Sequence, residues 1–237
     1  IEQKNDAGEK VDLTLDTAEV TNSTSVMITT VQGNEAAIGY ISLGSYDSSK
    51  VTALKVDGAE ATVENVKDGS YKVARPFMIA TKENVDEATQ DFINFILSTE
   101  GQEVVVEAGY ISLDNTKKFE RNKASGEIVV GGSSSVSPVM EKLIEAFENE
   151  NPNIEVKLQT SDSSTGMSST IDGTLDIGMA SRELKDSEKE KGLVGIQIAL
   201  DGIAVIVNKE NDLVTDLTSE QIMKIYTGEI VNWSEVE

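Results

Sequence analysis

Residues 126–138, GEIVVGGSSSVSP, carry the strongest structural signal in this chain. The apolar run Ile128–Val130 predicts a buried strand, and the Gly/Ser turn after it leads into a helix with Pro138 in its first turn. Such a strand–turn–helix unit directs free backbone N–H groups at the point where the helix begins. Because the positive end of the helix dipole lies at the same point, the segment predicts a site for an oxyanion.

The sequence after this segment predicts alternating helices and strands. Apolar residues at helical spacing predict one long helix after the turn, at Val136, Val139, Met140, Leu143, Ile144 and Phe147. Further strands are predicted at 154–158, 175–180 and 203–207, and a second helix is predicted to run through Ile171. This alternation predicts an α/β sheet with right-handed crossovers. Nearer the N-terminus, alternation over 51–66 around Asp57-Gly58 predicts a hairpin.

Three of the predicted strand-to-helix turns carry hydroxyl groups. The three turns hold Ser134 and Ser135, then Asp162, Ser163 and Ser164, and finally Ser181 and Arg182. Loops after parallel strands emerge at one edge of the sheet, where open α/β folds bind ligands. A single Ser-rich turn is more often a plain helix cap, but three such turns with one arginine favour a shared anion site.

Composition excludes several kinds of chemistry. The chain of 237 residues has 20 Lys and Arg against 42 Asp and Glu, a formal charge of −22, which disfavours nucleic acid and anionic lipid as partners. It has no His and no Cys, so histidine catalysis, thiol chemistry and disulfides are excluded, and we expect no metal and no cofactor. The acidic clusters at 145–150 and 183–190 are interpreted as solvated faces. No apolar run is long enough to span a bilayer, and no signal peptide is recognised.

Several motifs together resemble one known family. GGSSSVSP, DSSTG, DIGMASREL and IYTGEIVNWSE are similar to segments of the phosphate-binding protein of the bacterial phosphate ABC transporter, as are residues 34–44 and the Arg-Pro-Phe at 75–77. The resemblance covers nearly the whole chain. It implies a two-lobe, type II periplasmic-binding-protein fold with a ligand cleft between the lobes, and no catalytic residues.

The order of these motifs differs from that of the family. In the family, the strand at Ile128 opens the mature protein and the 34–44 segment follows the Trp233 region. We interpret the chain as a circular permutant, with engineering favoured as its origin and residues 113–125 as the linker joining the original termini. A third binding loop of the Gly-Ser-Gly-Thr type, within a unit of roughly 30 residues, is not found in the sequence, so we expect reduced phosphate affinity.

The resemblance also implies lobes, roles and partners. Residues 75–208 form one continuous lobe, while 1–74 and 209–237 together form the other. Donors to phosphate would come from Ser134, Ser135, Ser163, Ser164, Ser181 and Arg182. Some family members have an Asp at the position of Ser181 that accepts the proton of hydrogen phosphate, and we take Asp162, beside Ser163, as the substitute for it in this chain. We expect a monomer outside the cell or on its surface, working with the membrane permease of a phosphate transporter.

Three other functions remain open at this point. A receptor for sulfate or molybdate would share every feature above. A structural product would bind no ligand, and a carboxylate-based hydrolase would need a paired acid and base in the cleft.

The predicted role of Asp162 gives a direct test. If its carboxylate accepts the proton of hydrogen phosphate, Asp162→Asn lets sulfate compete with phosphate, because sulfate has no proton to donate. Competition calorimetry with the two anions measures this. Discrimination that Asp162→Asn leaves unchanged would contradict the assigned role.

Overall fold

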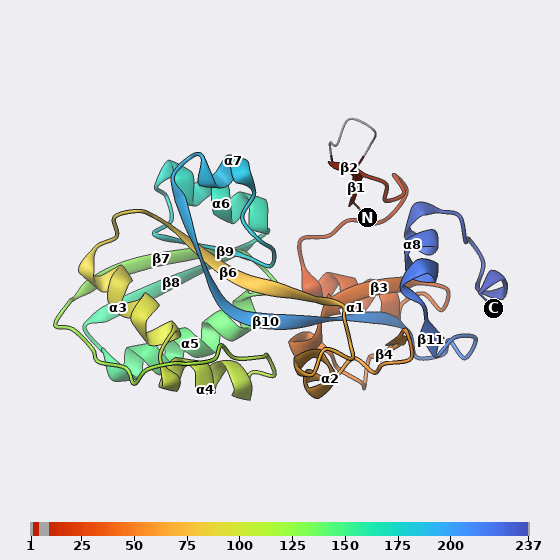
Figure 1. Cartoon of the computed structure of the whole chain (residues 1–237), viewed down its shortest axis with the longest axis horizontal. Coiled ribbons are helices and arrows are strands. Elements are labelled where there is room, and N and C mark those ends of the chain that lie inside the picture. Colours follow the sequence, from red (N-terminus) through yellow and green to blue (C-terminus); the bar gives the residue numbers. More distant parts are fainter. Residues whose placement is uncertain (1, 5–9, 237) are drawn as a thin grey trace.

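The computed structural model describes residues 2–4 and 10–236. Its elements form two groups, called lobe 1 and lobe 2 below, and two strands run from one group to the other (Figure 1). These connecting strands are β6 (Ala74–Lys82) and β10 (Leu193–Asn208). The division of the lobes at residues 75 and 208 stays a prediction.

Lobe 1 holds the segment with which the sequence analysis began. Its elements are α3 (Glu87–Ile96), α4 (Thr99–Glu107), β7 (Gly126–Ser133), α5 (Ser137–Glu150), β8 (Ile154–Ser161), α6 (Ser163–Asp172), β9 (Ile177–Ala180) and α7 (Asp186–Lys189). The predicted long helix is confirmed as α5, with Pro138 in its first turn.

Lobe 2 is built from both ends of the chain. Its elements are α1 (Thr24–Gln32), β3 (Ile38–Ser42), β4 (Val51–Ala53), β5 (Lys55–Val56), α2 (Val63–Lys67), β11 (Asp216–Leu217) and α8 (Ser219–Thr227), with 3-10 turns at Leu43–Ser45 and Trp233–Glu235. A small hairpin of β1 (Glu2–Lys4) and β2 (Lys10–Asp12) lies beside this lobe (Figure 1).

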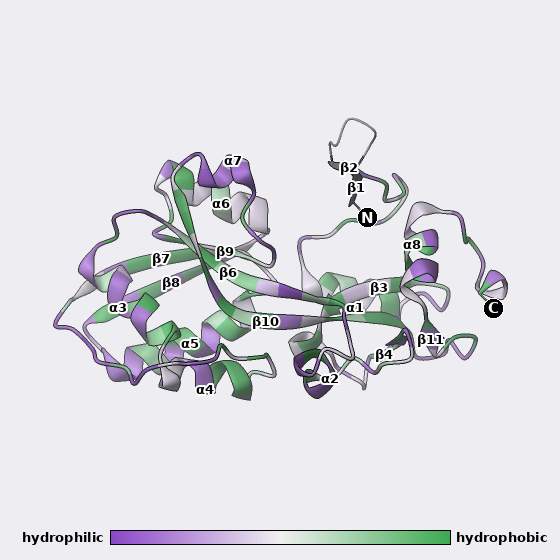
Figure 2. Ribbon diagram, in the orientation of Figure 1, coloured by the Kyte–Doolittle hydropathy of each residue, from purple (hydrophilic) through white to green (hydrophobic). Residues whose placement is uncertain are grey.

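The main sheet is mixed. Its strand order is β3-β10-β6-β9-β7-β8, and β4 also pairs with β10. In lobe 1, β7 is parallel to β8 and to β9, as predicted for a sheet of alternating strands and helices. The connecting strands β6 and β10 are antiparallel to each other. Figure 2 shows long hydrophobic stretches on β6 and β10, with hydrophilic segments where these strands pass from one group of elements to the other.

Strand β10 is shared by both lobes. Its first part pairs with β6 from Leu193 to Gly202, and its last part pairs with β3 from Ile203 to Val207. The sequence analysis predicted only 203–207 as a strand. Gly195 and Gln197 interrupt the apolar pattern of the first part, which is why that part was missed.

The 113–125 segment is packed against lobe 1. It contains no helix, but the ring of Phe119 lies 5.2 Å from that of Phe95 and 6.2 Å from that of Phe147. The N–H of Asn122 donates to the buried carboxylate of Asp91 at 2.9 Å. Its polar composition predicted a linker, but the Phe119 ring and several hydrogen bonds, among them Phe119 N–H to Glu100 at 2.8 Å and Thr99 N–H to the Lys117 carbonyl at 2.8 Å, anchor it.

The hairpin predicted over 51–66 is wrong. β4 pairs with β10, β5 pairs in parallel with β11, and residues 63–67 form a helix capped by Thr62. Only a single bridge, Val56 to Ala59, closes around the turn that Asp57-Gly58 predicted. The alternating apolar residues pack instead against strands distant in sequence, because these complete the core of lobe 2.

A buried ion pair joins the two connecting strands. Asp201 of β10 is fully buried, and its carboxylate accepts from Arg75 Nε of β6 at 3.1 Å and from the Ser42 hydroxyl at 2.7 Å. Burial raises the pKa of Asp201 to about 6, although Arg75 and Ser42 both favour the charged form. Asp201 is paired with Arg75 near the end of the part of β10 that pairs with β6, and the part that pairs with β3 begins two residues later at Ile203.

Within residues 2–4 and 10–236, no helix combines the length and hydrophobicity needed to cross a bilayer.

Protonation of Asp201 should make stability depend on pH. Its folded pKa of about 6 lies above the unfolded value of about 3.9, so its contribution is full below the lower value and is lost as pH rises through the higher one. A shift of about two units corresponds to about 3 kcal/mol. We therefore compare the free energy of unfolding of the unmodified protein with that of Asp201→Asn. The difference should fall by up to about 3 kcal/mol as the pH rises from below about 4 to above about 6.

Urea denaturation at several pH values measures this difference. Asp212→Asn, at an exposed position in a loop, is the matched control and should show no such dependence. A difference between the unmodified protein and Asp201→Asn that is constant with pH would contradict the assignment.

Candidate anion-binding site

Two close backbone contacts bring three turns together at one edge of the sheet. Gly132 of β7 has φ 134°, and a Cβ added there would lie 2.3 Å from the carbonyl oxygen of Met179 in β9. A Cβ on Gly166 of α6 would lie 2.7 Å from the Cα of Gly132. Glycine at both positions therefore lets β7, β9 and α6 approach at the edge where their turns begin.

The first turn leads from β7 into α5. The Ser134 N–H donates to the carbonyl of Ser161 at 3.0 Å, which joins this turn to the end of β8. No side chain caps α5, and no acidic residue stands in its first turn. Ser134 and Ser135 are half-buried, and among the described residues no hydrogen bond is found for either hydroxyl. The positive end of α5 is thus left without a compensating carboxylate.

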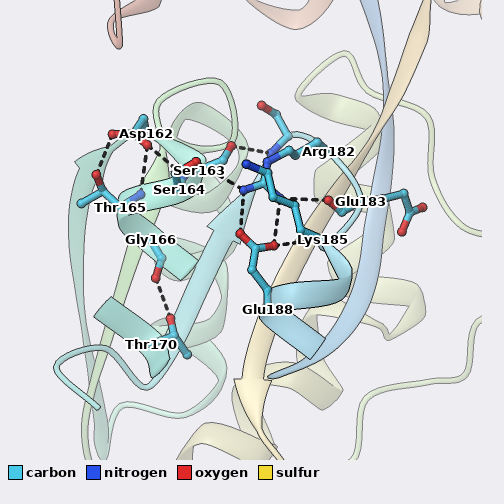
Figure 3. Close-up of polar contacts among 11 residues, drawn as sticks. Asp162, Ser163, Ser164, Thr165, Gly166, Thr170, Arg182, Glu183, Lys185 and Glu188 are labelled. Carbon is cyan, nitrogen blue, oxygen red and sulfur yellow. Dashed lines mark hydrogen bonds and ion pairs between the residues drawn. The ribbon is translucent and has the colours of Figure 1, made fainter. Parts of the chain in front are cut away.

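The second turn, at the start of α6, is different. Asp162 caps this helix: its Oδ1 accepts from the N–H groups of Ser164 at 2.8 Å and Thr165 at 3.0 Å, and its Oδ2 accepts from the Thr165 hydroxyl at 2.6 Å. These hydrogen bonds, the one from the Thr165 hydroxyl foremost, lower the pKa of Asp162. The carboxylate is engaged as a helix cap (Figure 3), and its role as acceptor for a phosphate proton stays a prediction.

The third turn follows β9 and is tied to the second. The N–H of Ser181 donates to the Ser163 hydroxyl oxygen at 3.2 Å. Arg182 reaches across to α6, where its Nη2 lies 3.4 Å from the hydroxyl oxygen of Ser164. All seven predicted site residues therefore lie on three adjoining turns.

A residue that the sequence analysis did not select completes the third turn. Glu188 of α7 forms a two-pronged ion pair with Arg182, with Nη1 2.9 Å from Oε2 and Nη2 2.8 Å from Oε1 (Figure 3). Only 8% of Glu188 is exposed, so the interpretation of 183–190 as a solvated face is wrong at this position. Burial alone would raise the pKa of Glu188, but the hydrogen bonds from Arg182 and the Lys185 N–H lower it.

The chemistry of the site is that of hydrogen-bond donation. Hydroxyl groups, the start of α5 and one guanidinium lie on the three adjoining turns, and such groups bind oxyanions. Both nearby carboxylates, Asp162 and Glu188, already accept several hydrogen bonds. Across the described parts of the chain, no group of three or more acidic residues could hold a metal ion.

Comparison with known proteins identifies the family to which the chain belongs. Residues 118–237 match the family profile of a PBP superfamily domain. The whole chain is 56% identical to phosphate-binding protein PstS 2 of Streptococcus agalactiae, covering 80% of that protein. It is 41% identical over 99% of its length to PstS 2 of Streptococcus pneumoniae, again covering 80% of the relative.

A solved structure of a phosphate-binding protein is also similar to this chain. A phosphate-binding protein of a phosphate ABC transporter from Streptococcus pneumoniae superposes with a TM-score of 0.76 at 40% identity, over 99% of this chain and 90% of the other. The fold is therefore that of a type II periplasmic binding protein. The chain belongs to the PstS family of phosphate-binding proteins within the PBP superfamily.

The cap on α6 can be tested by stability. Asp162→Ala removes an acceptor for two backbone N–H groups and should lower the free energy of unfolding by about 1 kcal/mol. Asp162→Asn should cost clearly less, because asparagine caps helices nearly as well as aspartate. Urea denaturation measures both variants. Equal losses in the two would mean that charge, rather than capping, gives Asp162 its effect on stability.

Proposed function

We propose that this protein is a receptor that binds inorganic phosphate for uptake by an ABC transporter. The observation that carries the proposal is the uncapped start of α5, next to the half-buried Ser134 and Ser135 and within the three adjoining turns. Relatives named as phosphate-binding proteins, at 56% and 41% identity, support phosphate as the anion.

The donors on the three turns are mostly uncharged groups, and they can bind an anion without a large positive charge at the site. Hydroxyls and backbone N–H groups can satisfy the oxygens of an oxyanion once water is removed, and such hydrogen bonds to a charged group are worth about 1.5–3 kcal/mol each. The overall charge of −22 opposes any anion, so binding has to depend on these local donors. Sulfate and molybdate receptors would use the same donors, and competition between the anions distinguishes them.

The predicted circular permutation is also part of this proposal. The Streptococcus agalactiae relative aligns with the whole chain, whereas the phosphate-binding protein PstS of Bacillus subtilis aligns with 48% of it. This pattern is expected if the two relatives have their segments in different orders.

Other features of a transport receptor follow from the same reasoning. Closure of the lobes around phosphate would bend β6 and β10 near the Arg75–Asp201 pair. We infer that the protein acts as a monomer outside the cell or at its surface, delivers phosphate to a membrane permease and performs no catalysis.

Phosphate binding can be measured on the 237-residue chain itself. At a phosphate concentration of 100 times Kd, binding should stabilise the protein by about 2.7 kcal/mol, which raises Tm by roughly 5–10 °C for a chain of this size. We expect Ser135→Ala to weaken binding at least about tenfold, because one hydrogen bond to the anion is lost.

Ser168→Ala is the matched control, since Ser168 is exposed on α6 beyond its first turn. It should bind phosphate as the unmodified protein does. Absence of any thermal shift or calorimetric signal with phosphate would overturn the proposed function. If sulfate binds more tightly than phosphate, sulfate is the ligand of the receptor.

A further inference from the structure

The guanidinium of Arg182 is largely occupied within the protein. Its Nη1 donates to the carbonyl of Glu183 at 3.0 Å and to Glu188, while its Nη2 donates to Glu188 and points to Ser164 (Figure 3). The 3.4 Å contact with Ser164 is the longest of these and the only one made to α6. An anion at the three turns would therefore meet Arg182 through this Nη2 edge.

Glu188 is held firmly in its place. Besides Arg182, its Oε2 accepts from the N–H of Lys185 at 2.8 Å, and 8% of the residue is exposed. A buried carboxylate with three hydrogen bonds fixes the guanidinium opposite it, because breaking the pair would leave an unpaired buried charge. Glu188 thus sets both the orientation of Arg182 and the charge of its surroundings.

The charged side chains around the site have no net positive charge. Arg182 contributes one positive charge, and Glu188 and Asp162 each contribute a negative one. The other charged groups on the same turn, Glu183 and Lys185, are exposed and of opposite sign. The site therefore offers hydrogen-bond donors without an excess of positive charge, in a protein of formal charge −22.

We infer that Glu188 is a positioning residue that sets which charge state of the anion the site prefers. By neutralising Arg182, it makes the site favour a singly charged oxyanion, such as monoanionic phosphate, over a doubly charged one. The inference rests on the proposed function, since it concerns the same site. The physical reason is that repulsion from the surrounding carboxylates grows in proportion to the charge on the anion.

Glu188→Gln tests this inference directly. Glutamine keeps the size of the side chain and one acceptor for Arg182 but removes the negative charge. Sulfate, which is doubly charged throughout the neutral range, should bind about tenfold more tightly to this variant. Glu183→Gln is the matched control, because the Glu183 side chain is exposed and only its carbonyl accepts from Arg182. It should change the Kd for sulfate by less than about twofold.

The pH profile of phosphate binding provides a second measurement on the unmodified protein. Its affinity should fall as pH rises through the second ionisation of phosphate, and Glu188→Gln should flatten this fall. The chain has no histidine, and the charged neighbours of the pair are Asp162, Glu183 and Lys185. Burial raises the pKa of Asp201, in the connecting strands, to about 6, so Asp201→Asn is the matched control and should keep the same fall in phosphate affinity. The fall in affinity of the unmodified protein can be measured even if Glu188→Gln does not fold.

The outcomes separate this inference from the proposed function. Weaker binding of both anions by the same factor in Glu188→Gln would mean that Glu188 acts on geometry alone, and it would overturn the inference. Phosphate affinity that rises with pH in the unmodified protein would also overturn it. An unmodified protein that binds no phosphate would overturn the proposed function, and this inference with it.

Discussion

The close approach of three backbone segments at Gly132 is the constraint on which the candidate site depends. β9 lies on one side of this residue and α6 on another, at distances that leave no room for a Cβ. The turns after β7, β8 and β9 consequently begin within hydrogen-bonding reach of one another, as the Ser134–Ser161 and Ser163–Ser181 contacts show. A side chain at Gly132 or Gly166 would push these segments apart and separate the donors.

Helices α5 and α6 both begin at this edge, but only α6 has a side-chain cap. α6 is capped by the carboxylate of Asp162, so the positive end of its dipole is already compensated. α5 has neither a side-chain cap nor an acidic residue in its first turn, so its positive end is available. The guanidinium nearby is also paired with a carboxylate. The uncompensated dipole of α5 is therefore the main electrostatic attraction for an anion that this edge offers.

Much of the fold could be predicted because its signals are local. The spacing of apolar residues along α5 and the strands at 128–130 and 175–180 each follow from neighbouring residues. The seven predicted site residues also follow from a local rule, since turns after parallel strands share one edge. Predictions that depended on distant partners were less accurate, as in the 51–66 region, where β4 and β5 pair with β10 and β11.

Local sequence patterns are sufficient to predict the alternation of strands and helices, the hydroxyl-bearing turns and the chemical classes that a chain without His and Cys excludes. Three features depend instead on the packing of the folded chain: Glu188 is buried against Arg182, Phe119 anchors the 113–125 segment and Asp201 joins the connecting strands. The physical reason is the same in all three cases. Burial of a charged or aromatic side chain depends on partners brought together by the packing of the chain, and sequence spacing carries little information about them.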